Sequence, residues 1–125
     1  MTLAFWCVFV AILLPLFPHA VKVVGRVRVG FDNRRPRDFD RLPSWAQRAA
    51  WAETNAFEAL PGFIAAVLIS HLLQADPRTT GTLSSAFIGA RLFHTIFYVL
   101  DLASLRTLAW FVGFGCVLGL FGQNF

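Results

Sequence analysis

The distribution of charge constrains this chain most, because one basic segment lies between long apolar stretches. Eight of the eleven Lys and Arg residues fall in that segment: Lys22, Arg26, Arg28, Arg34, Arg35, Arg37, Arg41 and Arg48. Hydrophobic residues make up 57% of the chain and charged residues 14%, whereas a soluble domain carries about 25% charged residues. This composition excludes a disordered chain, a coiled coil and most soluble enzymes. It predicts a small all-α integral membrane protein with one domain over residues 1–125.

The apolar stretches predict four membrane-spanning helices. We expect them over about residues 2–24, 45–74, 82–100 and 106–121, with a basic loop over residues 25–44. Pro15 and Pro18 are expected to kink or end the first helix in its last turns. A short turn is expected over residues 75–81. The predicted fold is therefore a four-helix transmembrane bundle.

The basic loop predicts how the bundle is oriented. Lys and Arg gather on the cytoplasmic side of membrane proteins, so we expect the loop in the cytoplasm and both termini outside. Because these charges adjoin membrane helices, they indicate membrane lipids rather than nucleic acid as partners. Cys7 and Cys116 lie in apolar runs without a His or Cys neighbour at metal-ligand spacing. Neither a metal site nor a disulfide framework is expected.

Ionisable side chains inside the predicted spans mark a candidate site, because a charge there costs about 2.5–3.5 kcal/mol on insertion scales. Two stripes of polar residues each share one helix face: Arg48, Asn55 and Glu58 in the second predicted helix, and Arg91, His94 and Tyr98 in the third. Both stripes are expected in the cytoplasmic half of the membrane, close to Arg106 at the start of the last helix. The sequence therefore predicts a polar pocket at one depth.

The residues alone leave two interpretations of this pocket. In the first, Glu58 pairs with Arg91 or Arg48, and the cluster only neutralises buried charge. In the second, four guanidinium groups bind carboxylates and two acceptors hold an ammonium group. These groups belong to Arg28, Arg48, Arg91 and Arg106, and to Asn55 and Glu58. Glutathione has the matching charges, although a simple carboxylate or phosphate ligand fits the cations equally well.

Three segments of the chain resemble the MAPEG family, the membrane-associated proteins of eicosanoid and glutathione metabolism. Residues 89–107, GARLFHTIFYVLDLASLRT, are similar to the family's RxxHTxxY stretch and the arginine that follows it. Residues 55–63, NAFEALPGF, are similar to its Asn-x-x-Glu motif followed by proline, and residues 25–28, GRVR, carry an arginine at the end of the first helix. With length and span number also in agreement, the resemblance covers essentially the whole chain.

The resemblance implies a homotrimer with glutathione as co-substrate between neighbouring subunits, open toward the cytoplasm. It assigns glutathione contacts to Arg28, Asn55, Glu58, Arg91, His94 and Tyr98, and catalytic roles to Arg106, Thr107 and Tyr98. Arg106 would stabilise the thiolate, assisted by the hydroxyl of Thr107 or Tyr98. The implied activity is that of a glutathione transferase or peroxidase acting on lipophilic electrophiles. The short chain and loops favour a bacterial member of the inner membrane.

Two departures from the family pattern concern the arginines before the motif asparagine. Trp51 occupies the position of an arginine common in the family, and Thr54 occupies one found in prostaglandin E synthase. Arg48, one turn earlier on the same face, is the candidate substitute. If it does not substitute, the alternative is a non-catalytic scaffold or lipid-binding protein with the same fold. A channel or transporter is disfavoured because the polar residues lie in one leaflet and trace no path across the membrane.

Overall fold

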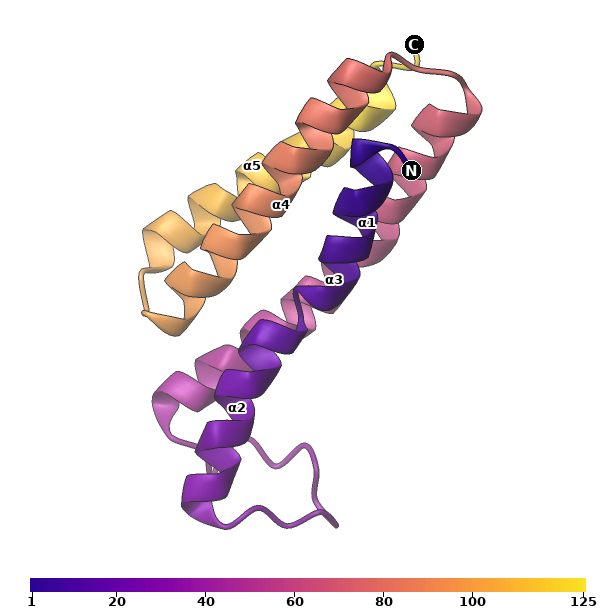
Figure 1. Cartoon of the computed structure of the whole chain (residues 1–125). Coiled ribbons are helices and arrows are strands. Elements are labelled where there is room, and N and C mark those ends of the chain that lie inside the picture. Colours follow the sequence, from indigo (N-terminus) through magenta and orange to yellow (C-terminus); the bar gives the residue numbers. More distant parts are fainter.

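A computed structural model describes residues 1–125, in which five helices and no strand are joined by loops and turns. The helices are α1 (Leu3–Leu13), α2 (Leu16–Val29), α3 (Ser44–Leu72), α4 (Pro77–Val99) and α5 (Ala103–Gly122). As Figure 1 shows, α2 lies beside the first half of α3 and α1 beside its second half, while α4 and α5 form a hairpin. Both termini lie at one end of the molecule, and the loop between α2 and α3 lies at the other.

The first predicted helix is two helices separated by a break at Leu14 and Pro15. Proline has no N–H to continue the hydrogen-bond ladder, which agrees with a break at this point. Helix α2 then continues to Val29, so the loop begins at Gly30 and not at residue 25 as expected. Gly30 ends the helix with a positive φ of 75°, a conformation that glycine adopts without strain.

Helix α4 begins five residues before the expected start, and the turn before it is correspondingly short. The Asp76 carboxylate caps the helix by accepting hydrogen bonds from the backbone N–H and the hydroxyl of Thr79. These bonds, first that of the Thr79 side chain and then that of its backbone, lower the pKa of Asp76 below its ordinary value of 3.8. Pro77 is the first residue of the helix, where its missing N–H is tolerated.

Three stretches are long and apolar enough to cross a membrane: Leu3–Val29, which combines α1 and α2, Ser44–Leu72, and Ala103–Gly122. Helix α4 has 23 residues but does not meet the same measure of apolarity. Its polar side chains include the buried Thr80, Ser84, Arg91, His94 and Thr95. Three of the four predicted spans are therefore supported by length and composition. The remaining one, α4, is a long helix with a polar buried face.

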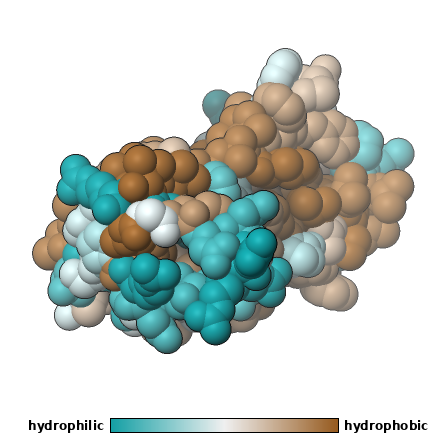
Figure 2. Space-filling view, turned by 90° about the horizontal axis from the view of Figure 1, so that it is seen from below, coloured by the Kyte–Doolittle hydropathy of each residue, from teal (hydrophilic) through white to brown (hydrophobic).

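The core is small and lies where α1, α3, α4 and α5 meet. Phe63 of α3 stacks on Phe87 of α4 with ring centroids 4.0 Å apart, and Leu120 of α5 is also fully buried. Many large apolar side chains point outward instead, as expected for a lipid-facing surface. Figure 2, which looks at the loop end, shows hydrophilic surface gathered at that end with apolar surface beyond it.

Candidate functional site

The centre of the candidate site is a hydrogen bond between α3 and α4. The Arg91 guanidinium donates from Nη2 to Oδ1 of Asn55 over 2.6 Å. Only 4% of Arg91 is exposed, so its positive charge is held within the bundle. Their spacing in the sequence predicted that these two residues line one pocket from two helices, and in the structure their side chains are in direct contact.

A cavity of about 360 Å³ lies beside this contact, between α3, α4 and α5. Asn55, Glu58 and Arg91 supply its polar wall. The rest of the wall is apolar, with Phe87, Trp110, Phe114 and Val117 among its residues. The cavity therefore offers a cation, an anion and an amide next to a surface that suits a lipophilic molecule.

Glu58 forms no ion pair in this structure. Arg91 is bonded to Asn55 instead, and Arg48 donates from Nε to the Val99 carbonyl over 3.1 Å. The first interpretation of the sequence, in which Glu58 is neutralised by one of these arginines, is therefore not the arrangement found. The Glu58 carboxylate remains free to accept hydrogen bonds from a ligand in the cavity.

Ring contacts along α4 lead from this pocket to the start of α5. His94 lies one turn after Arg91 and packs edge-on against Tyr98, with ring centroids 5.5 Å apart. The Arg106 guanidinium then lies over the Tyr98 ring, 4.6 Å from its centroid. His94 is 2% exposed, and its Nδ1 is buried without a hydrogen-bond partner. The structure thus groups Arg91, His94, Tyr98 and Arg106 along one side of the molecule.

Six predicted site residues do not line the cavity: His94, Tyr98 and Arg106, described above, and Arg28, Arg48 and Thr107. Arg28, at the end of α2, lies over the Trp45 ring at 5.4 Å. Arg48 reaches the carboxyl end of α4 through its bond to the Val99 carbonyl, next in the chain to Tyr98. The Thr107 hydroxyl donates to the Ala103 carbonyl one turn earlier in its own helix, and Thr107 is exposed.

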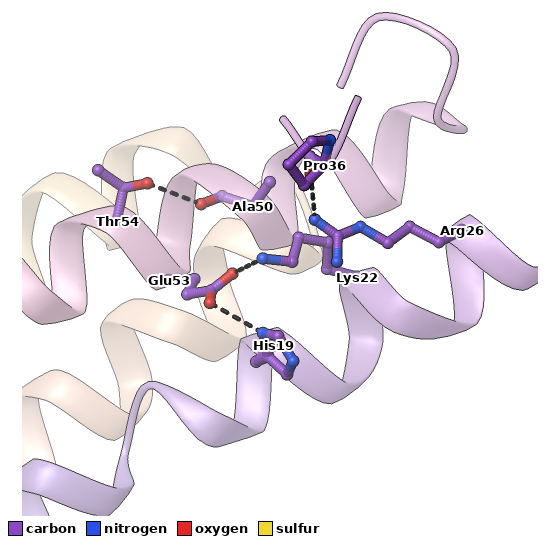
Figure 3. A network of polar contacts seen from close by, with 7 residues as sticks. All are labelled: His19, Lys22, Arg26, Pro36, Ala50, Glu53 and Thr54. Atoms are coloured by element: carbon purple, nitrogen blue, oxygen red, sulfur yellow. Dashed lines mark hydrogen bonds and ion pairs between the residues drawn. The ribbon is translucent and has the colours of Figure 1, made fainter. Parts of the chain in front are cut away.

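The two positions where family arginines are replaced provide no cation. Trp51 is 49% exposed on α3. The Thr54 hydroxyl donates to the Ala50 carbonyl of the same helix, as Figure 3 shows. Any replacement for the missing guanidinium groups must therefore come from elsewhere, and Arg48 is the nearest one along α3.

A second ionic cluster, for which sequence spacing suggested no pairing, lies on the other side of α3. Both oxygens of Glu53 are engaged by α2: Oε1 contacts His19 Nδ1 at 2.9 Å, and Oε2 accepts from Lys22 Nζ. Figure 3 shows the carboxylate between these two side chains, with Arg26 nearby bonded to the Pro36 carbonyl of the loop. Opposite charges at Lys22 and Glu53, each within an apolar segment, are the sequence signal for this pair.

Comparison with known proteins identifies the family. Residues 3–125 match the MAPEG family. The chain belongs to the MAPEG family. Human microsomal glutathione S-transferase 1 is 35% identical over 81 residues, which cover 64% of this chain and 52% of the human protein. The mouse protein of the same name is 33% identical over 85 residues, which cover 67% of this chain and 55% of the mouse protein.

The MAPEG assignment covers nearly the whole chain, but the relatives are distant. The chain spans about half the length of these two microsomal transferases over the matched region. No solved structure matches the chain significantly. Family membership together with three apolar helices identifies this MAPEG chain as an integral membrane protein.

Proposed function

We propose that this MAPEG chain binds glutathione in the cavity between α3, α4 and α5 and joins it through its sulfur to lipophilic electrophiles, or uses it to reduce them. The observation that carries the proposal is the composition of that cavity. A buried guanidinium held by Asn55, a free carboxylate at Glu58 and an apolar wall meet within about 360 Å³. The two curated relatives are named as glutathione S-transferases, which supports the same ligand.

The charged groups of the site match the charges of glutathione. Glu58 accepts hydrogen bonds from the ligand's ammonium group, and Asn55 completes this end of the site. Arg91 binds a carboxylate through the donors that its bond to Asn55 leaves free, and Arg48 binds a carboxylate at the other end through its Nη groups. His94 and Tyr98 form the wall between the two arginines.

Arg106 is proposed to hold the sulfur as a thiolate. It lies in the first turn of α5, which begins at Ala103, so the partial positive charge of the helix N-terminus adds to its own. The bound thiolate forms a bond to the electrophilic carbon while the leaving group departs with its electron pair. The Tyr98 hydroxyl, whose ring lies under Arg106, and the Thr107 hydroxyl are the candidates to donate a hydrogen bond to the sulfur.

The complete site is proposed to form in a homotrimer. In one subunit the cavity is open, and Arg28 packs on Trp45 away from it. Arg28 is then available to a ligand bound against a neighbouring subunit. The proposed setting is a bacterial inner membrane with the basic loop in the cytoplasm and both termini outside, which the positive charge of residues 22–48 supports.

Turnover in detergent micelles tests this function. The assay follows glutathione consumption with a lipophilic aryl halide and with a lipid hydroperoxide. We expect glutathione-dependent turnover that Arg106→Ala reduces by about 10²-fold or more, as for loss of one donor to a developing anion. Arg78→Ala, a change to an exposed arginine at the other end of the bundle, is the matched control and should leave turnover unchanged. Equal activity of both variants would refute the role of Arg106.

A non-catalytic scaffold or lipid-binding protein is the second candidate, and Trp51 and Thr54 favour it. Neither side chain supplies the positive charge of the arginine it replaces. A trimer that neither binds nor turns over glutathione would support the scaffold. Restoration of glutathione binding by Trp51→Arg would then identify the substitution that removed the activity.

A further inference from the structure

A second cavity, with a volume of about 290 Å³, lies at the end of the molecule opposite the basic loop. It is formed by the start of α1, the end of α3 and the start of α4, near the two chain termini in Figure 1. Its apolar side includes Ala4, Phe5 and Val67, and its polar side includes Ser70 and Thr80. None of its lining residues belongs to the proposed glutathione site.

The polar side of this cavity is a buried network. Ser70 is 1% exposed and Thr80 6% exposed. The Ser70 hydroxyl donates to the Leu120 carbonyl, and Gln123 Nε2 donates to both the Ser70 and the Thr80 hydroxyl over 3.1 Å. Asn124 also donates to Ser70, over 3.3 Å. Residues from four segments thus fix the positions of two hydroxyl groups at the cavity wall.

Hydrogen-bonding capacity is left over around this cavity. The Thr80 oxygen donates to the Asp76 carbonyl and accepts from Gln123, which leaves one lone pair. His71 packs its ring on Phe5 at 4.8 Å and, like Gln74, has no side-chain hydrogen bond. Behind the wall, the amide oxygens of Gln123 and Asn124 are buried without a donor. The Thr80 hydroxyl therefore keeps one acceptor position at the cavity wall, and the exposed His71 and Gln74 side chains each offer both a donor and an acceptor.

The lining residues also determine the charge of a ligand. Thr2, Ser70, His71, Gln74 and Thr80 are the polar ones, and no Lys, Arg, Asp or Glu lines the cavity. An ionic head group would find no charged side chain in the cavity wall itself and would lose part of its hydration. Hydroxyl groups, which both donate and accept, suit these side chains, while a hydrocarbon chain suits Phe5 and Val67.

We propose that this cavity binds the hydroxylated head group of a neutral lipid of the monoacylglycerol type. Its volume of about 290 Å³ lies just below the range of about 300–1,000 Å³ typical of ligand pockets, which fits a glycerol group and the first part of its chain but not a larger head group. Its place at the ends of membrane helices sets the head group at the depth of the lipid interface. The site shares no lining residue with the glutathione cavity, which lies beside the middle of α3.

Photolabelling of the full chain in nanodiscs tests this site, with 1-monoacylglycerol carrying a diazirine in its acyl chain as the probe. We expect saturable labelling of peptides containing Phe5 and Val67, reduced by excess monoolein but not by oleate or glutathione. Thr80→Val removes the hydroxyl and keeps the shape of the side chain. It should raise the probe concentration needed for half-maximal labelling by about 3- to 10-fold. Thr82→Val is the matched control, since the Thr82 hydroxyl bonds to Arg78 of its own helix outside the cavity.

A second variant keeps the test decisive if Thr80→Val perturbs the fold. Ala75 lines the cavity from the turn between α3 and α4, so Ala75→Phe fills the space without changing a helix. It should abolish the saturable labelling while helix content and oligomeric state stay those of the wild type. Labelling spread evenly over the apolar surface, labelling unaffected by Ala75→Phe, or competition by glutathione would each overturn the proposal.

Discussion

The buried pair between Lys22 and Glu53 makes a demanding prediction about stability. Only 7% of the Lys22 side chain and 14% of the Glu53 side chain are exposed, so neither charge is well solvated. Removing one partner of such a pair costs about 3–5 kcal/mol, because the other charge stays buried. Because His19 still contacts the second oxygen of Glu53, we expect Lys22→Met to lower the free energy of unfolding by about 3 kcal/mol, the lower end of this range.

Two comparison variants separate this burial effect from a general effect of lost charge. Lys22→Met combined with Glu53→Gln removes both charges, so it should recover most of the loss and lie within about 1 kcal/mol of the wild type. Arg35→Ala breaks a pair with Asp38 at 3.9 Å in which the arginine is 73% exposed. That pair should be worth about 1 kcal/mol or less, because water screens exposed charges.

Reversible unfolding in mixed micelles, followed by circular dichroism, measures all three variants. We expect Lys22→Met to lose the most free energy of unfolding, and the double variant and Arg35→Ala to lose less, by similar amounts. A loss of about 3 kcal/mol corresponds to roughly a 100-fold change in the unfolding equilibrium constant. The reasoning is refuted if Lys22→Met costs no more than Arg35→Ala, or if adding Glu53→Gln makes the protein less stable still.

Four further substitutions probe helix packing, the core and a helix cap by the same unfolding measurement. Gly25→Ala should destabilise by about 1–3 kcal/mol because its Cβ would overlap α3, whereas Gly89→Ala, with open space, should stabilise by about 0.5–1 kcal/mol; equal signs would contradict this packing. Phe63→Ala should cost about 3–5 kcal/mol, since the ring is fully buried, and a cost below 1 kcal/mol would place it outside the core. The carboxylate of Asp76 has a lowered pKa, so its contribution is complete above its ordinary value of 3.8 and lost as pH falls through the lowered value. The stability gap between wild type and Asp76→Ala should therefore close at low pH, and a gap that widens there would contradict the cap.

Most of the fold could be predicted from the hydropathy of the sequence and the helical spacing of its polar residues. The helices and the polar stripes followed from apolar length and from residues three, four or seven positions apart, which are local properties of the chain. Helix boundaries were predicted less well: α2 continues to Val29 and α4 starts at Pro77, because caps and backbone angles decide where a helix begins and ends.

The spacing of residues in the sequence did not predict which side chains bond to each other. The two stripes place Glu58 and Arg91 on neighbouring helices, but the rotation of each helix about its axis decides which atoms meet. In the structure Arg91 bonds to Asn55, and Glu58 is left free. Sequence spacing likewise gave no reason to join Glu53 to α2, because that contact depends on how two helices distant in sequence cross.

Calorimetric titration of glutathione into the purified protein tests the central claim most directly. The wild type is compared with Glu58→Gln, which removes the free carboxylate and keeps the size, and with Arg106→Ala. If glutathione binds at this site, we expect saturable binding to the wild type and at least tenfold weaker binding to both variants, with unchanged oligomeric state and helix content. Absence of binding by a folded wild-type protein, or equal binding by all three proteins, would contradict the account.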